Sequence, residues 1–181
     1  EYLHNEVGFI LQDPLLFDDT IINNVKYGAL NASEEEIVNA CKLVGAHEFI
    51  IRLKDGYNTS IGEGGIILSL GQKQLLAFAR VVLSNPSIVI LDEATSNIDS
   101  QTENLIQRNI ETLFKDKTCI FIAHRLSTIK NVDTIIYLEK GKIVEKGNHM
   151  ELMNLNGKYA ELYNNQFIER SLNSILGKEK E

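Results

Sequence analysis

The sequence has 181 residues, of which 44% are hydrophobic and 24% charged, the balance of a globular chain long enough for one domain with a buried core. Its 18 basic and 25 acidic side chains give a net charge of -7, which argues against nucleic acid as a partner. No apolar stretch reaches the ~18 to 20 residues needed to cross a bilayer, and the first residues do not resemble a targeting signal. We therefore expect any link to a membrane to come from another domain or chain.

Short apolar strands alternate with amphipathic helices along the chain. In order, the pattern predicts a strand at 7–11, helices at 33–45 and 46–57, a glycine-rich loop at 61–65, a helix at 69–85, a strand at 87–91, a helix at 100–114, strands at 118–123 and 133–138, a hairpin edge at 139–147 and helical segments at 148–165. The helix boundaries rest on capping signals, such as Ser33 with Glu36, Gly45 as a stop, and Pro86 after the helix that begins at Ser69. This alternation predicts an α/β fold with a parallel sheet covered on both faces.

The stretch "IVILDEATSNID", residues 88–99, runs a buried strand directly into Asp92 and Glu93. Ligands of parallel α/β sheets bind beyond the carboxyl ends of the strands, so the two acids fall where a ligand is expected. An aspartate there can hold Mg²⁺, usually through water, and a neighbouring glutamate can polarise an attacking water molecule. Taken alone, an acid pair that merely caps the next helix is the commoner explanation.

The segment "LSLGQ", Leu68 to Gln72, heads the helix that leads into this strand, and at this point the chain resembles the ATP-binding cassette family. The resemblance is carried by the whole run "LSLGQKQLLAFARVVLSNPSIVILDEATSNID" rather than by the five residues alone. It implies that Ser69, Leu70, Gly71 and Gln72 form a signature that meets the γ-phosphate of ATP held by the opposing subunit. It also implies ATP and Mg²⁺ as ligands.

The resemblance assigns four residues to the nucleotide and its metal. Asp92 and Gln12, in "FILQDPLLF", are implied as magnesium ligands, and Gln12 also as the Q-loop residue that senses the transmembrane partner. Glu93 is implied as the catalytic base, and His124, in "IFIAHRLST", as the switch histidine that contacts the γ-phosphate. As an isolated residue, each of Gln12 and His124 would be unremarkable in a loop.

Other residues are implied at interfaces. Glu63, in "GEGG", matches a loop that is characteristic of exporter-type members and is implied in coupling to the transmembrane domain. Ser96 to Asp99 match the D-loop, which crosses the interface to a second nucleotide-binding domain, although Asp99 also suits a helix N-cap. The implied partners are thus a second such domain, as homodimer or heterodimer, and a transmembrane domain, which would hold the chain at the cytoplasmic side of the cell membrane.

The sequence departs from the family pattern in two places. Leu70 stands where glycine is commonest, which predicts less room in the signature and a backbone in which a positive φ is disfavoured. The phosphate-binding motif G-x-x-x-x-G-K-[ST], the Walker A loop, is missing from the sequence. Its three Gly-Lys pairs are followed by Ile143, Tyr159 and Glu179, none of which supplies the hydroxyl that ligates magnesium. We therefore expect the chain to be a fragment whose missing loop would precede Glu1.

Together these patterns predict a P-loop NTPase-like parallel sheet core with an inserted α-helical signature subdomain, incomplete at the N-terminus. We expect a partial nucleotide-binding domain at 1–165, with the signature subdomain at about 20–85, and a tail at 166–181. The function implied is that of an ABC exporter ATPase, inactive as the fragment alone. A soluble cassette ATPase of DNA repair or translation and a non-catalytic interaction module remain as alternatives, which sequence upstream of Glu1 would decide.

Overall fold

The computed structural model describes residues 6–92, 105, 110, 113–123 and 129–175, with side chains to residue 168. The chain divides into two compact units, residues 1–122 and residues 123–181, and each unit is described by itself. The predicted domain at 1–165 with a tail at 166–181 stays a prediction.

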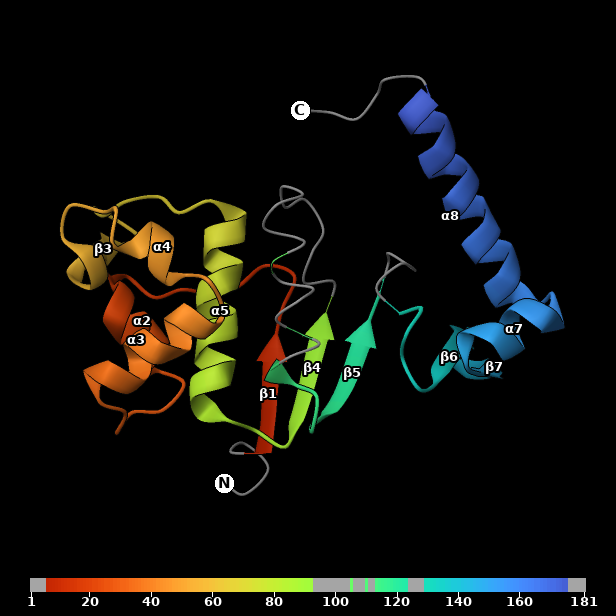
Figure 1. Ribbon diagram of the computed structural model, residues 1–181, viewed down its shortest axis with the longest axis horizontal. Helices are drawn as coiled ribbons and strands as arrows, with labels where there is room; N and C mark the ends of the chain where they lie inside the picture. The colour runs from red at the N-terminus through yellow and green to blue at the C-terminus, as the bar shows by residue number, and fades with distance from the viewer. Residues whose placement is uncertain (1–5, 93–104, 106–109, 111–112, 124–128, 176–181) are drawn as a thin grey trace. The chain divides into compact units, whose positions relative to one another are not determined.

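A three-stranded parallel sheet forms the centre of the first unit. Its strands are β1 (Val7–Ile10), β4 (Ile88–Asp92) and β5 (Thr118–Ile122), in the spatial order β1-β4-β5. The register pairs Ile10 with Leu91 and Leu91 with Phe121, so the strands end nearly level with one another. Figure 1 shows the three arrows pointing the same way, which confirms the predicted parallel arrangement and brings three carboxyl ends to one edge.

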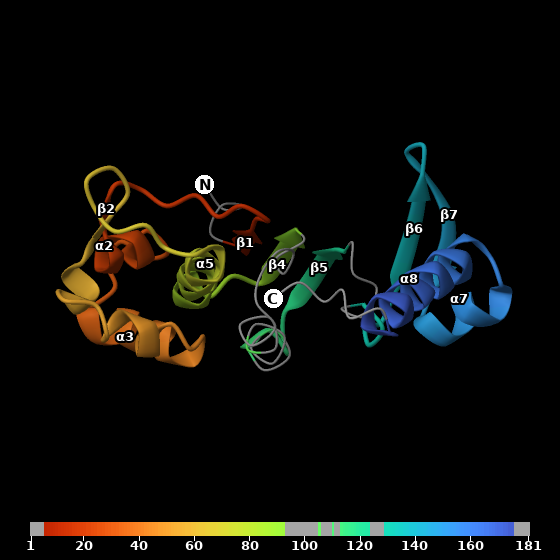
Figure 2. The ribbon, with the colours of Figure 1, turned by 90° about the horizontal axis from the view of Figure 1, so that it is seen from above.

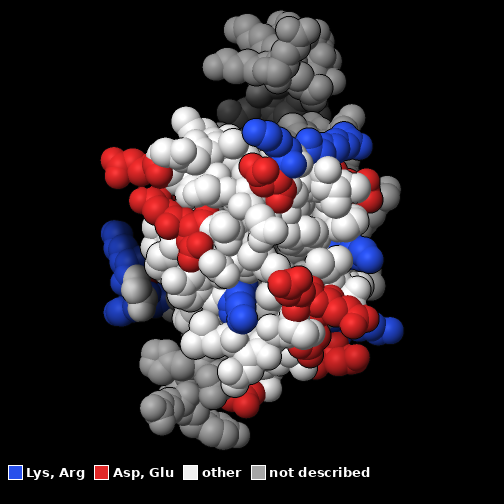
Figure 3. All heavy atoms as spheres, turned by 90° about the vertical axis from the view of Figure 1, so that its left-hand side faces the viewer, with Lys and Arg blue, Asp and Glu red and all other residues white. Residues whose placement is uncertain are grey.

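A helical part lies between β1 and β4 in the sequence. It contains the ribbon of β2 (Asp19–Thr20) with β3 (Ser60–Ile61), the helices α2 (Ile21–Lys26), α3 (Glu34–Leu43), α4 (His47–Ile50) and α5 (Leu70–Ser84), and the 3₁₀ turn η1 (Gly56–Asn58). The predicted capping box of α3 is present, because Ser33 and Glu36 each accept a backbone N–H of the other. On its outer face, seen in Figure 3, acidic and basic side chains are interspersed among uncharged areas.

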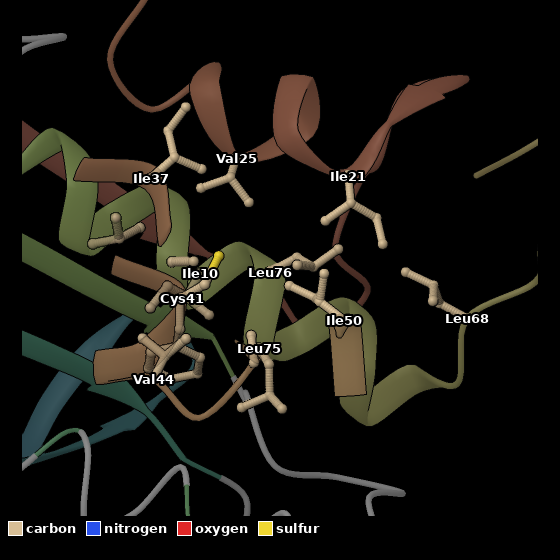
Figure 4. Close-up of a cluster of buried hydrophobic side chains, with 14 of the residues drawn as sticks. Ile10, Ile21, Val25, Ile37, Cys41, Val44, Ile50, Leu68, Leu75 and Leu76 are labelled. Atoms are coloured by element: carbon tan, nitrogen blue, oxygen red, sulfur yellow. The ribbon is translucent and has the colours of Figure 1, made fainter. Parts of the chain in front are cut away.

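One hydrophobic core joins the helical part to the sheet. Ile21 and Val25 from α2, Ile37 and Cys41 from α3, and Leu76 from α5 have no more than 1% of their surface exposed. Figure 4 shows these side chains converging with Ile10 of β1 between the helices. Because each such buried side chain contributes about 1.5–3 kcal/mol, this cluster fixes α5 against the sheet and the other helices.

The two faces of the sheet differ in burial. Ile10, Val89 and Leu91 face the helical core and are almost fully buried. On the other face Phe9 is 58% exposed and Ile122 is 50% exposed. The helix expected at 100–114 lies mostly outside the described residues, so a helical cover on this second face stays a prediction.

The second unit contains a hairpin and two helices, seen beside one another in Figure 2. Strands β6 (Ile135–Glu139) and β7 (Lys142–Gly147) pair antiparallel, and the turn between them has two positive φ angles, as expected of a tight hairpin. Helix α7 (His149–Leu155) is followed by α8 (Lys158–Ile175). Strand β6 pairs with β7 alone, rather than joining the parallel sheet, and α8 continues beyond residue 165.

The carboxylate of Glu145 connects the hairpin to α8. It accepts the backbone N–H groups of Lys158 and Tyr159 at 2.5 and 3.1 Å, two donors that have no partner within their own helix. A side chain on Gly157 would strike this carboxylate, so the close approach requires glycine there. No helix of the described residues has both the length and the apolar character needed to span a bilayer.

Candidate functional site

The carboxyl edge of the parallel sheet brings Gln12 and Asp92 to neighbouring strand ends. Asp92 is the last residue of β4 and is half-buried, while Gln12 lies two residues beyond the end of β1 and is exposed. Because Ile10 is paired with Leu91, the segments that follow β1 and β4 leave the sheet side by side. This edge is where the sequence placed the metal ligands, and their carboxylate and amide oxygens are the hard donors that Mg²⁺ prefers.

Glu93, Ser96, Asp99 and His124 lie outside the described residues, so the roles implied for them remain predictions. Two of them follow strands of the sheet closely in sequence. Glu93 comes directly after Asp92, the last residue of β4, and His124 comes two residues after the end of β5. Within the described part of the chain, no three His, Cys, Asp or Glu side chains gather in a group that could hold a metal.

The start of α5 carries the signature residues, and its cap is built as predicted. Ser69 is the N-cap: its hydroxyl oxygen accepts the N–H of Gln72 at 3.2 Å, and the Gln72 side chain accepts the N–H of Ser69 at 3.0 Å. The serine hydroxyl keeps its own proton for donation, and the N–H groups of the first turn point out of the helix. A 15-residue helix with this start favours an anion.

Leu70 occupies the signature position at which the sequence predicted that a positive φ is disfavoured. It is the first residue of α5, and its φ is not among the positive values of the described residues. This agrees with the expectation that a positive φ is disfavoured there, because leucine fits a right-handed helical backbone, while the smaller room in the signature stays a prediction. Gly71, the next residue, is buried.

A groove lies on the helical part beside the Q-loop. Its volume is about 360 Å³, and it is lined by Asp13, Pro14, Leu15, Leu16 and Phe17 after β1, by Ile61, Gly62, Ile66, Ile67 and Leu68 before α5, and by Lys73. Leu15 is 74% exposed and Ile67 is 94% exposed. Apolar side chains with this exposure, collected around one hollow, mark a surface that binds another apolar surface.

Glu63 lies in a glycine-rich turn and follows Gly62, which lines this groove. Its backbone N–H donates to the Asp18 carboxylate at 3.1 Å, while its own side chain is exposed. Gly62 has a φ of +99°, and a side chain there would collide with Asp18. Glycine at position 62 therefore lets the turn pack against Asp18, while the Glu63 side chain stays exposed.

The sequence did not predict the roles of two polar residues of α5, the buried Gln74 and the half-buried Arg80. Gln74 is 1% exposed, and its side-chain amide donates to the carbonyl oxygens of Leu11 and Gln12 at 3.0 and 2.8 Å. Arg80 donates to the backbone of Leu15 and to Asn24, and its burial lowers the pKa of the guanidinium. A glutamine on the apolar face of a predicted helix is the sequence signal that could have pointed to a buried hydrogen-bonding role for Gln74.

The described cysteines do not offer a reactive thiol. Burial raises the pKa of Cys41 to about 12, against a partial lowering by its hydrogen bond with Tyr57, and burial also raises the pKa of Cys119. Both side chains therefore stay protonated near neutral pH and behave as small apolar groups. Cys41 is buried and Cys119 is half-buried.

A parallel sheet with polar residues at its carboxyl edge, beside a capped helix that favours an anion, defines the class of P-loop-type nucleotide-binding α/β domains. The model of the family described as "ABC transporter" matches residues 1–96. The chain belongs to this family.

Similar proteins cover most of the chain. It is 49% identical over 170 residues to "ABC transporter B family member 4" of Dictyostelium discoideum, covering 94% of this chain and 22% of that protein. Identity is also 49% over 170 residues to the "ATP-dependent lipid A-core flippase" of Legionella pneumophila (strain Paris), covering 94% of this chain and 29% of the relative. The solved structure of a bacterial Atm1-family ABC exporter with ATP bound is 43% identical, with a TM-score of 0.84 over 91% of this chain and 29% of that chain.

Proposed function

We propose that the chain is part of the nucleotide-binding domain of an ABC exporter, in which ATP hydrolysis drives the export of a substrate across the cell membrane. The observation that carries this proposal is the presence, in one unit, of the capped signature helix and the sheet edge with Gln12 and Asp92. The similarity to a lipid A-core flippase and to the solved structure of an ABC exporter supports the exporter branch. The chain spans only 22% to 29% of the length of the relatives compared above.

The proposed reaction is attack of water on the γ-phosphorus of ATP, which breaks the bond to the β-phosphate oxygen and releases ADP and phosphate. Asp92 and Gln12 would hold the Mg²⁺ ion, which neutralises charge on the phosphate oxygens when it is bound. Glu93 would accept the proton of the attacking water, and His124 would hydrogen-bond the γ-phosphate and orient that water.

The signature would act on the nucleotide of a second domain. Ser69 has a hydroxyl proton to donate, and the first-turn N–H groups beside it would meet the γ-phosphate across the interface of a homodimer or heterodimer. Ser96 and Asp99 of the D-loop would cross the same interface. Hydrolysis would thus require two domains, each completing the site of the other.

The apolar groove would receive the transmembrane partner, with Gln12 and Glu63 reporting its position to the nucleotide site. Leu15 and Ile67 present the large exposed side chains that a docking helix would bury, at about 25 cal/mol per Å² of apolar surface. This docking would place the domain at the cytoplasmic side of the membrane. A soluble cassette ATPase would leave the same side chains in water.

The test is the variant Glu93→Gln in the complete transporter. We expect ATP binding to be retained and turnover to fall by about 10²- to 10⁴-fold, because an amide cannot accept the proton of the attacking water. The nucleotide-bound dimer should accumulate. Glu48→Gln, an exposed acid of α4, serves as the matched control and should hydrolyse ATP normally. Near-normal turnover of Glu93→Gln would remove Glu93 from the proposed role.

A further inference from the structure

Gln74 ties the backbone of the Q-loop to the second turn of the signature helix. Its side-chain amide donates to two successive carbonyl oxygens, those of Leu11 and Gln12, across more than 60 residues of sequence. The side chain is 1% exposed, and its own oxygen has no hydrogen-bond partner among the described residues. A buried amide that leaves its oxygen unpaired is costly, so its place in this apolar helix face needs a reason beyond packing.

Arg80 holds the other end of the same segment from the same helix. It lies six residues after Gln74, about 9 Å further along the helix axis. Its guanidinium donates to the carbonyl oxygens of Leu15 and Asn24, each at 2.5 Å, and to the Asn24 side chain at 2.7 Å. It also lies over the ring of Phe17, 5.5 Å from its centroid. Residues 11–17, here called the strapped segment, are therefore fastened to α5 at both ends.

The strapped segment is one wall of the apolar groove, and α5 begins with the signature serine. Five groove-lining residues, 13–17, belong to this segment. Ser69 lies five residues before Gln74, so about a turn and a half of capped helix separates it from the first strap. The core contacts of Leu76 and Phe78, both fully buried, keep the helix itself from bending.

We infer that Gln74 and Arg80 are positioning residues that make the Q-loop, the groove wall and the signature helix move as one body. The inference rests on the proposed function, because it concerns how a partner in the groove displaces Ser69 toward the opposing nucleotide. The straps act through the backbone and do not touch nucleotide themselves. Without them, the groove wall would shift while the signature stayed in place.

Gln74→Met tests the inference, because methionine keeps the length and volume of the side chain and removes both donated hydrogen bonds. In the complete transporter, we expect the amides of residues 11–17 to exchange hydrogen about tenfold faster or more, with α5 unchanged. Val81→Ala is the matched control, since Val81 is buried on the same helix and faces Gly8 at the start of β1. It should not accelerate exchange selectively in the strapped segment.

The second measurement is ATP turnover with the same variants. We expect Gln74→Met to lower kcat several-fold with KM for ATP unchanged, because closure of the signature is impaired and initial nucleotide binding is not. Arg80→Met should likewise lower kcat with KM for ATP unchanged, and hydrogen exchange should be faster at residues 15–17. Wild-type exchange and wild-type kcat in Gln74→Met would overturn the inference, as would faster exchange without any loss of kcat. Absence of ATP hydrolysis in the wild-type transporter would instead contradict the proposed function.

Discussion

Replacing Asn24 by alanine should destabilise the first unit more than any exposed substitution in the helical part. Asn24 is fully buried and uses all of its hydrogen-bonding capacity. Its side-chain oxygen accepts the N–H of Phe17 at 2.9 Å and an N–H of Arg80 at 2.7 Å. Its amide nitrogen donates to the carbonyl oxygens of Phe17 and Thr20, both at 3.0 Å. Alanine would remove all four hydrogen bonds, although the Phe17 carbonyl would keep the N–H of Asp19 as a donor.

The size of the effect follows from these four bonds. A neutral hydrogen bond contributes about 0.5–1.5 kcal/mol and one to a charged group about 1.5–3 kcal/mol, which gives roughly 3–7 kcal/mol in total. Water entering the small space left by the side chain would satisfy part of this demand, so we expect a loss of about 3–4 kcal/mol. Against a typical stability of about 5–15 kcal/mol, this is a large fraction.

Urea unfolding followed by circular dichroism measures this loss. With a slope of about 1.5–2 kcal/mol per molar urea, the midpoint should fall by about 2 M. The matched control is Asn23→Ala, because Asn23 precedes it on α2 but is exposed, and its hydrogen bond to Asp19 lies in water. That control should cost about 0.5 kcal/mol or less. Equal losses for the two variants, or a loss below about 1 kcal/mol for Asn24→Ala, would refute the reasoning.

Three further outcomes follow from the proposed site. His124→Ala in the complete transporter should reduce ATP hydrolysis more than ATP binding, and unchanged turnover would exclude it from the site. Ser69→Arg should prevent closure of the dimer, with the damage in a mixed dimer falling on the site of the partner; a loss confined to the mutant chain's own phosphate-loop site would contradict the assignment. Calorimetric titration of the 181-residue chain with Mg-ATP should show no tight binding, because the sequence has no G-x-x-x-x-G-K-[ST] loop, whereas a longer protein with that loop should bind. Tight binding by the chain alone would refute this account.

Local signals predicted much of the first unit. Ser33 with Glu36 and Ser69 with Gln72 are capping boxes in the structure, because each uses residues only three apart in sequence. Gly45 ends α3 with a φ of +78°, a conformation that glycine adopts without strain. The strand before Asp92 was predictable from its continuous apolar run, and its parallel partners from the intervening helices.

Contacts between distant parts of the chain were not predictable in the same way. Whether β6 joins the parallel sheet depends on which strand edges meet in space, and its apolar run suits a parallel or an antiparallel neighbour equally. The straps of Gln74 and Arg80 join residues separated by 56 to 65 positions. A residue pattern with a period of one helical turn carries no information about such partners.

Helix α5 has two roles that require different side chains, packing in the hydrophobic core and holding the backbone of the Q-loop. Leu76 and Phe78 hold it in the core, so truncating either one would cost about 2–5 kcal/mol and would disturb stability and turnover together. Gln74 lies among these apolar residues but donates its hydrogen bonds to the Q-loop backbone. Its replacement by methionine should therefore lower turnover without a matching loss of stability. A purely apolar helix would satisfy the core equally well. The polar straps pair carbonyl groups that an apolar helix would leave without these donors, and the inferred coupling of the groove wall to the helix that carries Ser69 gives them a second role.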